Sequence, residues 1–153
     1  MKIQNMEQGR EGWRPSRQEV DDFLREQTLC TIASLDADGH PQVATVAFSV
    51  TEDHKLIIGT NESSRKAGNI ARDPHVAVVV TDEDQRYTVQ LEGTAQILSP
   101  EEFEPYSDEH YNQLPASRPF KDQPGEVNIL VGPTHLRFSD CDVHPWQKTE
   151  YDY

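Results

Sequence analysis

The chain has 153 residues, close to the usual size of one domain, and its 27 acidic against 14 basic residues give a formal net charge of −13. A surface of this sign repels polyanions, so we expect no nucleic-acid partner. The first residues lack the apolar core of a signal peptide, and the longest aliphatic run, 76–80, is too short to cross a bilayer, so we expect a soluble, cytoplasmic protein with no membrane partner.

The first half of the sequence predicts one helix and then three short strands. Ser16 precedes Glu19 at the spacing of a capping box and is followed by apolar residues at helical intervals. The stretches 28–35, 41–50 and 55–60 are rich in β-branched residues and are separated by polar turns. This order predicts a short amphipathic helix followed by a three-stranded meander.

The second half continues in short strands. We expect a strand at 75–80 and a long one at 86–98, in which Gly93 indicates a bulge or a bend. Ser99, followed by Pro100 and by Glu102, predicts a helix start, and Pro105 predicts a kink or break within that helix. Two final strands are expected at 127–132 and 134–140.

Six to seven strands with short peripheral helices predict a mainly β protein, built as an antiparallel barrel. We divide the chain into an N-terminal tail (1–15), one domain (16–140) and a C-terminal tail (141–153) without clear periodicity. Strands 43–48 and 76–80 carry apolar residues on both faces, which indicates that a second surface is covered. We therefore expect a homodimer.

The stretch "TNESSRKAGNI", residues 60–70, is locally basic in an acidic chain. Ser63 and Ser64 are both suitable N-caps, and the free N–H groups of a helix N-terminus bind anions. Arg65 and Lys66 then lie in the first turn, where the helix dipole disfavours each cation by roughly 0.3–1 kcal/mol. A bound dianion would reverse this, since each charge-assisted hydrogen bond contributes about 1.5–3 kcal/mol. On spacing alone, a capped surface helix and a phosphate cradle fit equally well.

The segment "GTNESSRKAGNIARDPHVAVVV" resembles the phosphate-binding segment of the pyridoxamine 5'-phosphate oxidase-like, flavin-binding split barrels. The order of the surrounding stretches agrees over residues 16–140: a helix, "TIASLDADGHPQVATVAFSV", "LIIGTN", and "VQLEGTAQIL" followed by "SPEEF". The resemblance implies a six- to seven-stranded antiparallel split β-barrel of the Greek-key type. It is closest to the short, single-domain, general-stress-protein type of the family.

The resemblance also implies a cofactor and its site. FMN would be held by its phosphate at Thr60, Asn61, Ser64, Arg65 and Lys66, and its ring would lie along the strand at Thr45, Val46 and Ala47. The cofactor would sit at the subunit interface of the homodimer. Gln90 would reach the flavin of the partner subunit, and Trp146 would cover the ring; a solvent-facing Gln90 and a Trp146 that anchors the tail are the alternatives.

The sequence departs from the oxidase that names the family. That enzyme has an Arg and a terminal Lys on the strand that reads "VATVAF" here, and it has a C-terminal extension with an Arg and a His that contact the pyridoxal ring. We therefore do not expect pyridoxamine 5'-phosphate as the substrate. The implied function is an FMN-binding oxidoreductase acting on an unidentified small molecule. The alternatives are a deazaflavin (F420)-dependent reductase, a non-catalytic flavin-binding stress protein, and a binding protein that has lost the cofactor.

No side chain stands out as a catalytic acid or base, because a flavin brings its own redox chemistry and the acidic residues fall mostly in turns and on helix faces. The histidines show no metal-ligand spacing and no match to a haem ligand, and the two cysteines form no CxxC pair, so no metal site is expected. Phe120 is a weak candidate for the substrate opening, and His40 is expected in a turn.

Overall fold

The computed structural model describes residues 14–153, so most of the expected N-terminal tail lies outside the described residues. The strands are β1 (Leu29–Leu35), β2 (Pro41–Ala47), β3 (Ser49–Val50), β4 (Leu56–Asn61), β5 (His75–Thr81), β6 (Tyr87–Leu98), β7 (Glu126–Asp140) and β8 (Gln147–Asp152). The helices are α1 (Arg17–Glu26), α2 (Arg65–Arg72), α3 (Pro100–Gln113) and the 3₁₀ helix η2 (Pro115–Phe120).

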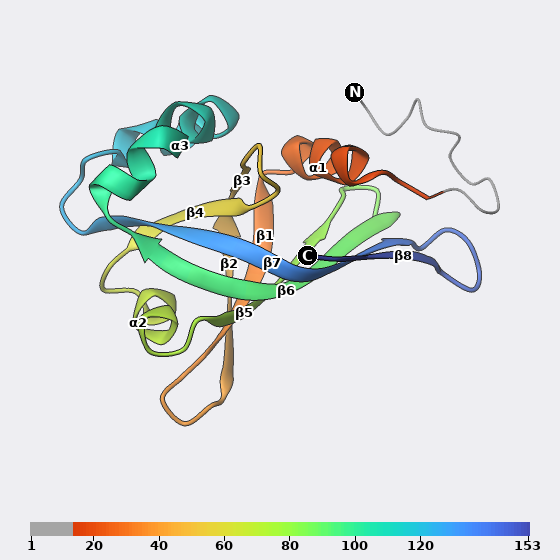
Figure 1. The fold of residues 1–153 in the computed structure, drawn as a ribbon, viewed down its shortest axis with the longest axis horizontal. Coiled ribbons are helices and arrows are strands. Elements are labelled where there is room, and N and C mark those ends of the chain that lie inside the picture. Colours follow the sequence, from red (N-terminus) through yellow and green to blue (C-terminus); the bar gives the residue numbers. More distant parts are fainter. Residues whose placement is uncertain (1–13) are drawn as a thin grey trace.

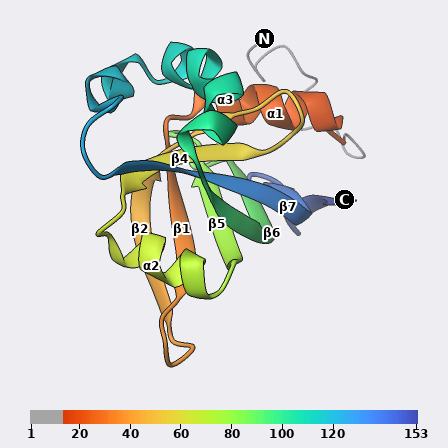
Figure 2. The same cartoon turned by 60° about the vertical axis from the view of Figure 1, so that its left-hand side comes forward.

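All eight strands form one curled, antiparallel sheet in the order β2-β1-β5-β6-β7-β4-β3, and β8 adds to β7 (Figure 1). In both views α1 and α3 lie on the same side of the sheet, whereas α2 lies toward the other end (Figures 1 and 2). The sheet curls until β2, one edge strand, approaches β4, which lies next to the opposite edge. The predicted antiparallel split barrel is confirmed.

A single large cluster of apolar side chains fills the curled sheet, and α1 closes it with Phe23 and Leu24, both almost fully buried. Phe23 meets Phe138 and Tyr87 edge-on, with ring centroids 5.8 and 6.2 Å apart. Cys30 is buried in the same cluster as a free thiol. A smaller cluster under α3 contains Phe103 and Tyr111.

The predicted helix starts are confirmed. Ser16 accepts a hydrogen bond from the backbone N–H of Glu19 at 3.2 Å, and Ser99 and Glu102 form a complete capping box. Helix α3 is not broken at Pro105 but continues to Gln113. Buried side chains on both sides of the proline, Phe103 before it and Tyr111 after it, keep the helix packed on the sheet.

The strands depart from expectation in three places. The stretch 41–50 forms two strands, β2 and β3, separated at Phe48. The prediction of two final strands is wrong, because β7 runs unbroken over residues 126–140, and a register shift opposite Glu92 and Gly93 accommodates Pro133. Residues 141–153, which showed no periodicity, contain β8.

None of the helices within residues 14–153 is long and apolar enough to span a membrane.

Candidate functional site

The turn between β4 and α2 brings together several of the predicted cofactor residues. Ser64 is the N-cap of α2, and its hydroxyl accepts a hydrogen bond from the backbone N–H of Ala67 at 3.3 Å. Thr60 donates its hydroxyl to Ser64 Oγ at 3.2 Å, and Asn61 Oδ1 accepts from both the backbone N–H and the hydroxyl of Ser63. These bonds fix the hydroxyl groups of Thr60 and Ser64 side by side at a helix N-terminus.

Arg65 and Lys66 lie in the first turn of α2, which contains no acidic residue. They line a cavity of about 230 Å³, the α2 cavity, together with Ile32, Ser34, Gln42, Val43, Ala44 and Asn69. Lys66 is half-buried, and desolvation lowers the pKa of its ammonium group. Within residues 14–153 neither cation forms an ion pair, although the chain has 27 acidic residues. The α2 cavity therefore has two uncompensated positive charges.

Helix α2 is held against the sheet by a buried amide. Asn69 Nδ2 donates to Ser34 Oγ at 3.1 Å and to Gln42 Oε1 at 2.9 Å, so one side chain ties α2 to β1 and β2. Sequence reasoning missed Asn69. The signal was available, because Asn69 follows Arg65 by four residues and therefore lies on the same face of the helix.

Strand β2 carries Thr45, Val46 and Ala47 at an edge of the sheet. Within the described chain β2 pairs with β1 alone, so the backbone groups along its other edge have no partner strand. Thr45 is exposed, whereas Val46 packs against the core, as the alternation of a strand requires. The other edge of β2 is therefore open in the described chain, and a flavin ring along it stays a prediction.

A second cavity, of about 240 Å³, lies between the ends of β2 and β4 and is covered by α3 and η2; we call it the α3 cavity. Its lining contains Ala47, Thr60 and Asn61 from the predicted set, and also Phe120. The predicted residues therefore do not share one cavity. Arg65 and Lys66 line the α2 cavity, and Ala47, Thr60 and Asn61 line the α3 cavity, whereas Thr45, Val46 and Ser64 line neither.

Gln90 and Trp146 lie elsewhere. Gln90 lines a groove of about 360 Å³ on the outer face of β1, β5, β6 and β7, the sheet-face groove, which Val43 also borders. Val43, on the edge strand β2, lines the α2 cavity as well, but the β1 residues of that cavity, Ile32 and Ser34, lie on the opposite face of the sheet from the groove residues Thr31 and Ala33. Trp146 precedes β8, is 49 % exposed, and lines neither the two cavities nor the groove.

His110 is a site residue that the sequence did not reveal. It lies on α3, is 3 % exposed, and shares a 2.7 Å hydrogen bond through Nδ1 with Ser49 Oγ. Burial lowers the pKa of its imidazole from 6.5 to about 4, so the ring is neutral near pH 7. Its spacing from Phe103, seven residues along the helix, would have placed it on the buried face.

This neutral histidine should make the protein less stable in mild acid. Below about pH 6.5 the unfolded chain takes up a proton at His110 that the folded chain refuses until about pH 4, so the free energy of unfolding falls across this window by up to roughly 3 kcal/mol. Glutamine cannot ionise, so we expect the His110→Gln variant to lack this part of the fall in the free energy of unfolding. Denaturant unfolding of both proteins between about pH 7 and about pH 4.5 measures it. A stability difference between them that stays constant with pH would contradict the prediction.

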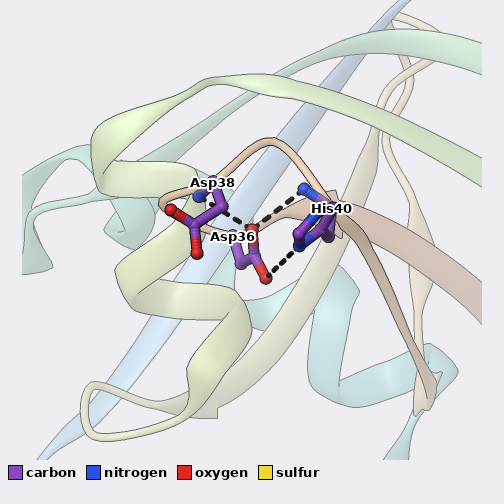
Figure 3. A group of neighbouring side chains, drawn as sticks. All are labelled: Asp36, Asp38 and His40. Atoms are coloured by element: carbon purple, nitrogen blue, oxygen red, sulfur yellow. Dashed lines mark hydrogen bonds and ion pairs between the residues drawn. The ribbon is translucent and has the colours of Figure 1, made fainter.

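Three potential metal ligands, Asp36, Asp38 and His40, lie together in the β1–β2 turn (Figure 3). Asp36 Oδ1 accepts hydrogen bonds from the backbone N–H groups of Asp38 and His40, both at 2.9 Å. The bond from His40 is the main cause of the lowered pKa of Asp36. The carboxylate of Asp36 thus already closes the hairpin turn, and His40 lies in a turn as predicted.

Comparison with known proteins shows which family the chain belongs to. The family model described as "Pyridoxamine 5'-phosphate oxidase" matches residues 16–132. A pyridoxine/pyridoxamine 5'-phosphate oxidase of Bacteroides thetaiotaomicron is 31 % identical over 106 residues, which are 69 % of this chain and 46 % of that protein. The match therefore spans about half the length of this curated relative.

Solved structures agree on the fold. A conserved hypothetical protein of Mycobacterium tuberculosis superimposes with a TM-score of 0.66 at 26 % identity, over 86 % of this chain and 88 % of its own. A pyridoxamine 5'-phosphate oxidase-related, FMN binding protein of Nostoc punctiforme gives a TM-score of 0.69 at 14 % identity, over 94 % of this chain and 99 % of its own. The family model covers most of the curled sheet and the α2 segment, and the chain therefore belongs to the pyridoxamine 5'-phosphate oxidase-like family of split barrels.

Proposed function

We propose that the protein binds FMN and acts as a flavin-dependent oxidoreductase on a small molecule. The observation that carries this proposal is the half-buried ammonium group of Lys66, which has no carboxylate partner among residues 14–153 and faces the α2 cavity beside Arg65. An unpaired, partly desolvated cation is costly unless an anion joins it. A phosphate monoester fits, because both cations lie in the first turn of α2, at a helix N-terminus whose cap is Ser64.

The residues present fit the rest of the cofactor as well. The free backbone edge of β2 would hydrogen-bond the edge of the ring, and Asn69 would keep α2 at a fixed distance from that strand. Bound FMN would supply the capacity to accept or donate electrons or a hydride, so the protein needs to contribute position and exclusion of water. The Nostoc relative, which is named as an FMN binding protein, supports this choice of cofactor.

A homodimer is part of the proposal. Leu29 and Val43, which are 57 % and 64 % exposed, lie on the two paired strands β1 and β2, and Val43 borders the sheet-face groove. Exposed apolar side chains that adjoin a groove are typical of a surface covered by a partner. A second copy on this face would cover Val43 on the edge strand β2, which lines both the groove and the α2 cavity.

Pyridoxamine 5'-phosphate is not part of the proposal. Residues 43–48 contain no basic residue, and the match to the named oxidase covers less than half of that enzyme.

The absorption spectrum of the purified protein tests the proposal most directly. We expect a yellow protein whose acid extract contains FMN by mass spectrometry and whose sedimentation gives the mass of two chains. A deazaflavin in the extract would mean that the cofactor is a deazaflavin and not FMN. A colourless protein that fails to bind added FMN would refute flavin binding altogether. Turnover of a reduced nicotinamide with an electron acceptor then separates an enzyme from a non-catalytic flavoprotein.

A further inference from the structure

The α3 cavity is a second binding site whose chemistry differs from that of the α2 cavity. We propose that it takes an unphosphorylated, single-ring compound that is uncharged or cationic, and that it is the substrate site. The inference rests on the proposed function, because Thr60 and Asn61 line the α3 cavity and also belong to the segment proposed to hold FMN. A ligand in this cavity would therefore lie next to the cofactor.

The size and walls of the α3 cavity limit the ligand. Its volume of about 240 Å³ is below the range of about 300–1,000 Å³ that holds drug-sized molecules, so it suits one ring with a short substituent. Tyr111 and Leu114 form a buried apolar wall, and Phe120, which is 57 % exposed, stands at the rim. An aromatic ring packs favourably against such side chains.

The charge of the cavity decides which substituents are accepted. Among the described residues that line it, Glu126 is the sole charged side chain, and there is no lysine or arginine. Burial raises the pKa of the Glu126 carboxyl group, and the group forms no ion pair within residues 14–153. Arg118 and Lys121 lie nearby but over the ring of Tyr111, at 5.7 and 5.9 Å from its centroid.

The carboxylate of Glu126 lies close to Gly59 on the neighbouring strand β4. A Cβ atom on Gly59 would lie 3.1 Å from Glu126 Oε1, so glycine on β4 leaves room for this carboxylate on the paired strand β7. His110 adds a neutral ring to the lining, since burial lowers the pKa of its imidazole to about 4. A ligand ammonium or hydroxyl group would satisfy Glu126, whereas a phosphate or carboxylate would be repelled by it.

Three probes that share one ring and differ in charge test this inference: benzylamine, benzyl alcohol and benzoate, measured by calorimetry or ligand-observed NMR. We expect benzylamine to bind about tenfold more tightly than benzyl alcohol, and benzoate to bind more weakly than both. In the Glu126→Gln variant the affinity for benzylamine should fall to that for benzyl alcohol. The affinity for benzyl alcohol itself should be unchanged. Glu83→Gln makes the same change of charge in an exposed turn outside the cavity and should keep the preference for the amine.

The binding preference of the α3 cavity can be measured separately from FMN binding. A variant with Arg65→Ala and Lys66→Ala, neither of which lines the α3 cavity, should lose FMN but keep the preference for benzylamine. If FMN fails to bind the native protein while this preference persists, the proposed function falls, and with it the role as a substrate site, whereas the ligand chemistry assigned to the α3 cavity stands. Benzoate binding as tightly as benzylamine, or an amine-to-alcohol ratio that Glu126→Gln leaves unchanged, would overturn the assignment.

Discussion

Replacing both Arg65 and Lys66 with alanine is expected to weaken FMN binding by more than about 100-fold while the protein stays folded. Each side chain would make at least one charge-assisted hydrogen bond to the phosphate, and two such bonds contribute roughly 3–6 kcal/mol. Every 1.4 kcal/mol corresponds to about a factor of ten in affinity, so even the lower figure exceeds two orders of magnitude.

The folded state should tolerate this double substitution. The helix dipole disfavours both cations in the first turn of α2, and neither forms an ion pair that would be lost within residues 14–153. The substitution of Lys66 also removes an ammonium group whose charged form is disfavoured by partial burial, as its lowered pKa indicates. We therefore expect the free energy of unfolding to change by no more than about 0.5 kcal/mol.

A matched control distinguishes the loss of phosphate contacts from a change in the net charge of the protein. Arg72 and Lys148 are exposed, do not line the α2 cavity, and carry the same two charges. Their double replacement with alanine should leave the FMN dissociation constant, measured by the quenching of flavin fluorescence, within a factor of about two to three. Retained FMN binding in the Arg65 and Lys66 variant, or equal losses in both variants, would show that this helix start is not the phosphate site.

The features that the sequence predicted well are local ones, formed by residues close together in the chain. Ser16, Ser64 and Ser99 each cap a helix by accepting a hydrogen bond from a backbone N–H three residues on, so the whole feature lies within one turn of chain. The basic segment was recognisable for the same reason, because Thr60, Ser64 and Lys66 lie within seven consecutive positions.

What the sequence did not reveal depends on contacts between distant segments. Strand β8 has no apolar alternation to signal it. It pairs with β7, and polar side chains connect the two strands, with Arg137 to Glu150 at 2.7 Å and His135 to Asp152 at 2.8 Å. The α3 cavity takes its lining from β2, β4, α3, η2 and β7, and spacing along one segment cannot bring such residues together. The neutral state of His110 likewise follows from its burial in the folded protein.

Gly93→Ala is expected to destabilise the protein by about 3 kcal/mol or more, the largest effect on stability that we predict for one substitution. The sequence indicated a bulge or a bend at Gly93, and the register between β6 and β7 does shift between Glu92 and Gly93. Here the two strands approach so closely that a Cβ atom on Gly93 would lie 2.3 Å from the carbonyl oxygen of Gly132 and 3.0 Å from Cα of Pro133.

The clash is with backbone, which cannot move aside as a flexible side chain could. Gly93 has no positive φ, so the cost is steric and not conformational. Relieving it requires β6 and β7 to separate, and this disturbs the hydrogen bond from Thr134 Oγ1 to the carbonyl oxygen of Glu92. Since β7 also pairs with β4 and β8, the disturbance would spread through the sheet.

Gly132→Ala is the matched control on the facing strand. Its added Cβ would have its nearest neighbour, Thr94 O, at 3.8 Å, which is an ordinary van der Waals contact. For a chain of this size a loss of about 3 kcal/mol lowers the melting temperature by roughly 6–12 °C, so circular dichroism melts of the two variants should differ clearly. Equal melting temperatures would mean that β6 and β7 can move apart at little cost. In that case the bulge would not require glycine at position 93.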